Sequence, residues 1–159
     1  MKTTKQTIEL TKKQFLALLK AVYLGNWIAN AGRTEGHKKD YEGIEDYIFS
    51  LAPQFGLEKY VQYDESDDDK YYSTNYFEET TDVQDIVEEY DDDTFWEELA
   101  ERLGGKDFIR TYSEEEVEKM SNAERFTLLN RFIEKYHMEF ENFGLEKIEL
   151  RKITKRSTN

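Results

Sequence analysis

Apolar residues recur at every third or fourth position in the first part of the chain, which is the spacing of one helix face. This pattern begins at Phe15. Thr11 with Gln14 forms a capping box, in which the two side chains satisfy free N–H groups at a helix start. The pattern therefore predicts a central helix that ends at "AGRTEGHKK". A second helix should run from about Asp40 to Pro53, because proline cannot continue a helix.

Four further capping boxes stand in register with apolar residues in the second half of the chain. They are Thr81 with Gln84, Asp93 or Thr94 with Glu97, Ser113 with Glu116, and Ser121 with Glu124. Each pair predicts the start of a helix. Glycine is common just after a helix, so Gly104 and Gly105 should end the helix that starts at residue 93 or 94, and Gly144 should end the last one.

The two ends of the chain carry short segments that alternate apolar and polar residues, "KQTIEL" and "LEKIELRKI". Such segments could pair as a small two-stranded sheet. The whole pattern predicts a mainly α protein, a compact single-domain bundle of about five or six helices over residues 1–159. Residues 1–5 and 154–159 are expected to be mobile, and residues 62–80 to form an acidic, tyrosine-rich connection.

Composition supports a folded, cytoplasmic protein. The chain has 10 Phe, 11 Tyr and 2 Trp, and disordered chains are poor in such residues. It has no cysteine, which excludes disulfides and cysteine zinc sites. The N-terminus lacks signal-peptide features. The most apolar run is 17 residues long and is interrupted by Lys20, Asn26 and Asn30, too short and polar to span a bilayer. Small size and a single proline suit a bacterial or phage protein.

Charge is concentrated in the middle of the chain, where residues 40–99 hold 21 acidic and two basic residues. Such a segment repels nucleic acid and anionic membranes, so we expect neither to bind this face directly. It attracts basic protein surfaces, and tyrosine adds rigid contact area with a polar tip. We therefore expect a non-catalytic, regulatory protein that binds a basic partner. The predicted partner-binding residues are Asp82, Asp85, Glu88, Glu89, Asp91, Asp92, Asp93, Tyr71, Tyr72 and Tyr76.

Two other interpretations of the acidic residues remain open. The chain has 16 acidic residues between Asp64 and Glu98. Its helical part, residues 82–98, would be about 25 Å long, and B-DNA of that length carries roughly 15 phosphates. The segment could therefore mimic a nucleic acid on a DNA- or RNA-binding protein, although helical acids point around a cylinder. Alternatively, the acids serve only solubility.

Metal and enzyme motifs are weak. A calcium-loop frame that starts at Asp64 has Asp69 where glycine is needed and Asn75 where glutamate is needed. Glu134 and His137 form one E-x-x-H pair, which is half of a di-iron motif. No nucleophile elbow or phosphate-binding loop is present. We therefore assign no catalytic residue, no cofactor and no metal ligand.

If the protein is an enzyme or metal-binding protein instead, its site must be built from scattered residues. The best place to look is the polar end of the central helix, where Asn26 and Asn30 lie four residues apart beside Trp27, with Arg33 beyond them. The simpler interpretation of these residues is a helix that turns polar towards its C-terminus.

Overall fold

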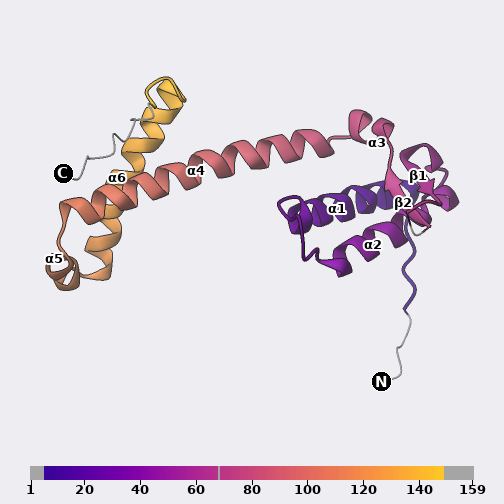
Figure 1. Cartoon of the computed structure of the whole chain (residues 1–159), viewed down its shortest axis with the longest axis horizontal. Coiled ribbons are helices and arrows are strands. Elements are labelled where there is room, and N and C mark those ends of the chain that lie inside the picture. Colours follow the sequence, from indigo (N-terminus) through magenta and orange to yellow (C-terminus); the bar gives the residue numbers. More distant parts are fainter. Residues whose placement is uncertain (1–5, 68, 149–159) are drawn as a thin grey trace, which may run out of the picture. The chain divides into compact units, whose positions relative to one another are not determined.

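The computed structural model describes residues 6–67 and 69–148, shown in Figure 1. The mainly α prediction is confirmed, because these residues form six α-helices and one small sheet. The helices are α1 (Lys12–Asn30), α2 (Lys39–Ser50), α3 (Asn75–Thr80), α4 (Val83–Thr111), α5 (Glu114–Lys119) and α6 (Asn122–Phe143). The strands are β1 (Val61–Asp64) and β2 (Lys70–Ser73), and 3₁₀ turns span Ala52–Phe55 and Glu58–Tyr60.

The sheet is an antiparallel hairpin inside the acidic connection, with Val61 opposite Ser73 and Asp64 opposite Lys70. It does not join the ends of the chain in the way the sequence pattern suggested. Residues 6–10 have no regular structure, residues 145–148 form turns, and residues 149–153 lie outside the described residues. Aromatic side chains pack across the two strands, as Tyr63 and Tyr71 do with ring centroids 5.0 Å apart, and such cross-strand pairs stabilise a hairpin.

The described residues group into two units, one up to Glu89 and one from Tyr90 onward. In the N-terminal unit, α1, α2 and the hairpin pack on α3 and the first turn of α4. The fully buried residues of this core are Phe15, Leu19, Phe49, Ala52, Leu57, Phe77 and Val83. Phe77 meets the rings of Tyr23, Phe49 and Tyr60 edge-on. The short helix α3 is thereby anchored, although it is too short to be stable alone.

Three predicted helix starts are confirmed. Thr11 and Gln14 form the full capping box of α1, and Ser113 with Glu116 forms that of α5. Ser121 accepts the backbone N–H of Glu124 at the start of α6.

The box predicted at Thr81 is wrong, because α4 begins at Val83. The Thr81 hydroxyl donates to the carbonyl of Phe77, and the Gln84 side chain donates to Tyr23. The Thr81 side chain is therefore bonded to the preceding helix and the Gln84 side chain to α1, so neither is left to form the predicted capping box.

The predicted start at Asp93 or Thr94 and the predicted stop at Gly104 and Gly105 are also wrong, since α4 continues through all four residues. In the C-terminal unit, Gly104 provides a close approach between α4 and α6. A Cβ at Gly104 would lie 2.7 Å from the side chain and 2.8 Å from the backbone nitrogen of Ile133. Glycine is there for packing and not as a helix stop.

Ala100, Phe108 and Phe140 form the buried part of the C-terminal unit, in which Trp96 packs on Phe140 and Phe132 meets Phe108. Within the described part of the chain, no helix has both the length and the apolar character needed to cross a membrane.

Candidate functional site

The N-terminal unit carries a hollow of about 230 Å³ beside the hairpin. We call it the aromatic hollow. Its walls come from α1, α2 and β2, which the core holds together. The residues that line it are Tyr23, Asn26, Trp27, Glu45, Tyr72 and Ser73. It combines three aromatic rings with one carboxylate.

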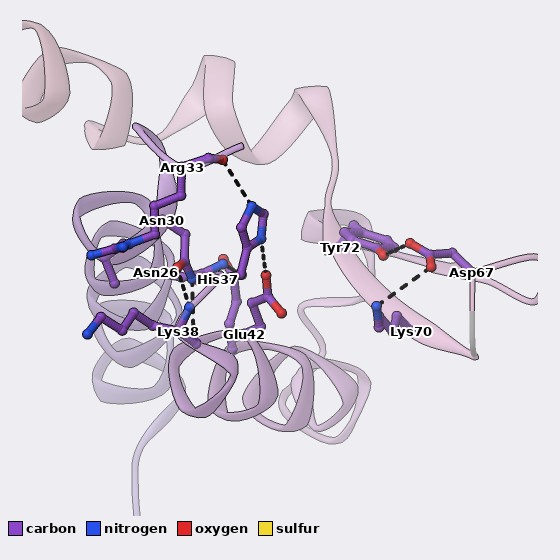
Figure 2. A network of polar contacts seen from close by, with 11 residues as sticks. Asn26, Asn30, Arg33, His37, Lys38, Glu42, Asp67, Lys70 and Tyr72 are labelled. Carbon is purple, nitrogen blue, oxygen red and sulfur yellow. Dashed lines mark hydrogen bonds and ion pairs between the residues drawn. The ribbon is translucent and has the colours of Figure 1, made fainter. Parts of the chain in front are cut away.

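A chain of amide hydrogen bonds positions that carboxylate. The amide of Asn30, a buried residue near the end of α1, donates to Asn26 at 2.6 Å, and Asn26 donates to Oε2 of Glu45 at 2.5 Å. Asn30 is itself fixed by the backbone of Lys38, whose N–H donates to its side-chain oxygen at 2.7 Å (Figure 2). The backbone of the α1–α2 loop therefore sets the orientation of Glu45 through two asparagines.

Glu45 has an unusual protonation equilibrium. Burial raises its pKa from 4.5 to about 7, and the neighbouring carboxylates of Glu42 and Asp46 push it in the same direction. The hydrogen bond from Asn26 acts against them. At neutral pH the carboxylate is thus only partly ionised, because burial destabilises the ionised form more than the hydrogen bond from Asn26 stabilises it. A positive charge in the hollow would reverse this balance.

The aromatic walls are fixed by hydrogen bonds of their own. The Tyr72 hydroxyl donates to Asp67, which also pairs with Lys70 at 3.6 Å (Figure 2). The Tyr23 hydroxyl accepts from Gln84 at 2.9 Å. Burial, followed by the nearby carboxylate of Glu78, raises the pKa of Tyr23 to about 12. Both tyrosines therefore stay neutral at physiological pH.

A second hollow, of about 400 Å³, is connected to the first by hydrogen bonds between residues that line them. We call it the acidic hollow, and its lining residues are Asn75, Glu78, Glu79, Thr81, Gln84 and Asp85. The two hydrogen bonds that connect the hollows run from Gln84 to Tyr23 and, at 2.7 Å, from Ser73 to Glu78. Among the described residues, no lysine, arginine or histidine lines either hollow. The combined surface presents only acidic and neutral groups.

The predicted tyrosines have separate surroundings. Tyr72 lines the aromatic hollow. Tyr71 is half-buried, and its backbone N–H donates to Asp46 at 2.8 Å. Tyr76 is exposed on α3, and its hydroxyl accepts from Lys59 at 2.8 Å. Of the three, Tyr72 is therefore the one that the structure brings to the hollows.

The predicted acids lie along α4, except Asp82, which directly precedes this helix. Asp85 lines the acidic hollow, and Asp82 forms an ion pair with Lys20 at 2.8 Å. Glu88 and Glu89 are exposed in the N-terminal unit. Asp91, Asp92 and Asp93 are exposed on the part of α4 that belongs to the C-terminal unit.

Glu45 and Glu78 are site residues that the sequence did not single out. The one sequence signal was the polar pair Asn26 and Asn30 on an apolar helix, which does mark the support of Glu45. Arg33 is not part of the hollow, because its Nε donates back to the carbonyl of Ala29.

The E-x-x-H pair of α6 does not come together as a ligand set. His137 lines a hollow of the C-terminal unit with Glu141, Asp93 and Glu97, whereas Glu134 lines a different one. No group of three or more histidine, aspartate or glutamate side chains that could hold a metal ion is found among residues 6–67 and 69–148.

Comparison of the chain with protein-family models, with curated protein sequences and with solved structures gives no match.

Proposed function

We propose that this protein is a non-catalytic binding and regulatory module that holds a basic segment of a partner protein on the two hollows of its N-terminal unit. The observation that supports this most is their joint lining, in which Glu45, Glu78, Glu79 and Asp85 are accompanied by aromatic and neutral side chains alone. Complementary potentials steer and orient such partners. Tyrosine and tryptophan add contact area at low entropic cost.

The surrounding charge favours the same partner. Glu79 and Asp85 are exposed at the acidic hollow, and Glu88 and Glu89 continue the negative surface along α4. Exposed acids of this kind raise the rate at which a basic protein arrives. They repel nucleic acid, so a partner protein is the better candidate.

The experiment compares two variants that each remove three charges. In the hollow variant, E78Q/E79Q/D85N, the glutamine at 78 keeps an oxygen for Ser73. In the matched control, D91N/D92N/D93N, the exposed acids of the C-terminal unit are replaced. Each protein, with a photo-crosslinker at Asn75, is used to capture partners from lysate at low and at raised salt.

We expect the wild type and the matched control to crosslink the same basic protein, with a yield that falls as salt rises. The hollow variant should lose at least nine-tenths of that yield. Equal yields from all three proteins would contradict the proposal, as would a captured protein that is not basic. Loss in both variants would instead assign binding to the whole acidic length of α4. Competition by duplex DNA tests the narrower idea that the partner is a nucleic-acid-binding protein.

A further inference from the structure

The aromatic hollow has the chemistry of a site for one organic cation. The rings of Tyr23, Trp27 and Tyr72 contribute to its lining, and Glu45 provides the single charge. A cation is attracted to the face of an aromatic ring, and aromatic cages that recognise ammonium groups rely on this attraction. The attraction is strongest where water is excluded, as it partly is around Glu45.

We propose that the aromatic hollow receives one lysine side chain of the basic partner, with its ammonium group against Glu45 and facing the aromatic rings that line the hollow with it. This assignment rests on the proposed function and makes it specific, because it names the group that is recognised. The acidic hollow next to it then holds the neighbouring basic residues of the same segment.

Size restricts the occupant. The hollow measures about 230 Å³, which is below the roughly 300–1,000 Å³ typical of pockets for drug-sized ligands. It therefore suits one side chain or a small amine. A lysine in a peptide segment would also let the neighbouring residues of that segment contact the acidic hollow, whereas a free amine would contact the aromatic hollow alone.

The hydrogen bonds of Glu45 favour lysine over arginine. Arginine binds a carboxylate best with two parallel N–H groups, one to each oxygen. Here Oε2 of Glu45 already accepts from Asn26 at 2.5 Å, so the bidentate arrangement would compete with the amide chain. A lysine ammonium is a compact point charge and needs only one oxygen.

The hollow is organised before any ligand arrives. Asn30 holds Asn26, Asn26 holds Glu45, and Asp67 holds the hydroxyl of Tyr72. Such support lowers the entropic cost of binding. The burial that raises the pKa of Glu45 to about 7 also favours binding of a cation, because the cation would stabilise the ionised carboxylate that burial destabilises.

The test uses lysine analogues as probes on the full chain, followed by NMR of the Trp27 indole N–H. N-acetyl-lysine methylamide is compared with its norleucine counterpart, which has a similar shape but no charge. We expect saturable shifts with the lysine probe and at least tenfold weaker binding of norleucine. Equal binding of the two would overturn the assignment. Tetramethylammonium is the third probe and represents a free organic cation. If this ion binds more tightly than the lysine probe, the conclusion that the occupant is a lysine side chain is wrong.

Two variants and one control locate the site. E45Q removes the charge and keeps an oxygen for Asn26, and we expect it to weaken the lysine probe at least tenfold. Y72L keeps apolar bulk and removes the ring, and should weaken the probe several-fold. D40N removes a charge from the same helix at an exposed residue that does not line the hollow and is not among the groups that shift the pKa of Glu45, and it should change the affinity less than twofold. Unchanged affinity in E45Q would refute the proposal.

Failure of this inference can be told apart from failure of the proposed function. If the partner is lost in E78Q/E79Q/D85N but is held equally by E45Q and the wild type, the lysine assignment is wrong and the binding module stands. If no variant changes partner capture, both are wrong.

Discussion

Replacing Glu45 with glutamine should make the N-terminal unit more stable at pH 8 while leaving its stability at pH 4 unchanged. In the folded protein burial raises the pKa of Glu45 from 4.5 to about 7. In the unfolded chain the carboxyl group is in water and has its ordinary pKa. Between these two values the folded state holds a proton that the unfolded state releases. The free energy of unfolding therefore falls as the pH rises through this window.

The size of the effect follows from the two pKa values. One pKa unit corresponds to about 1.4 kcal/mol, so ionising Glu45 in the folded state costs at most about 3.5 kcal/mol. Glu45 keeps partial access to water, which relieves part of this cost, and we expect about 1–2 kcal/mol. Glutamine carries no charge and retains an oxygen for Asn26. The advantage of E45Q should therefore grow from near zero at pH 4 to about 1–2 kcal/mol at pH 8.

Urea unfolding between pH 4 and pH 8.5 measures this difference. The chain has two tryptophans, so a W96F background leaves Trp27 as a fluorescent reporter of the N-terminal unit. E88Q in the same background is the charge-matched control, because Glu88 is exposed and its replacement should change stability by less than about 0.5 kcal/mol at pH 8. An advantage of E45Q that is the same at every pH, or a lower stability than wild type at pH 8, would refute the reasoning.

Two further predictions concern glycines and a histidine. G104A should lower the free energy of unfolding of the C-terminal unit by about 1–3 kcal/mol, because its Cβ would collide with the backbone of Ile133. G105A, which meets nothing within 4 Å, should raise it by about 0.5–1 kcal/mol. Thermal unfolding followed by circular dichroism measures both, and changes of the same sign would contradict the packing argument. His37 should titrate above 6.5 in NMR spectra, because the Glu42 carboxylate accepts a hydrogen bond from its ring. E42Q should return this pKa towards 6.5, and an unchanged value would contradict the assignment.

Helix positions were predictable where local and tertiary signals agree. At Thr11 and Ser121, a capping residue precedes a helix with several buried or half-buried apolar residues, so the cap and the packing indicate the same start. At Ser113 the full capping box fixes the start of a short helix that has one half-buried apolar residue, Val117. At residue 93 an acceptable capping residue lies inside α4, and nothing nearby prevents the helix from continuing. A capping residue permits a helix start and does not require one.

The hairpin could not be predicted from hydrophobic alternation. Its strands are four residues long, and three of the four residues in β1 are exposed. Tertiary and cross-strand contacts stabilise it, such as the hydrogen bond from the Tyr71 N–H to Asp46 and the contact between the rings of Tyr63 and Tyr71. Asp69 adopts a positive φ of 57° at the turn, which aspartate tolerates better than most residues.

The candidate site shows why counting charges identifies a surface and not a site. The acids between residues 40 and 99 are numerous, and most of them are exposed. In the sequence, Glu45 is one acid beside Glu42 and Asp46. The fold distinguishes the three, because it places Glu45 against Asn26, Glu42 against His37, and Asp46 against the backbone N–H of Tyr71. The sequence indicates the asparagine pair. The packing of α1 against α2, which brings Asn26 to Glu45, depends on the tertiary structure and cannot be predicted from a local sequence pattern.

The proposed function assigns different tasks to the exposed and the buried acids. Under this proposal, exposed charges such as Glu79 and Asp85 would act over distance and mainly set how fast a basic partner arrives, an effect that salt screens. Glu45 would act only at contact, where reduced access of water strengthens its interaction with a cation and thereby slows dissociation. The same negative surroundings that attract the partner also raise the pKa of Glu45, through Glu42 and Asp46. A ligand with a positive charge would therefore stabilise the ionised form of Glu45, which burial and the neighbouring acids disfavour. This is how a single half-buried carboxylate would provide the specificity that the many exposed ones lack.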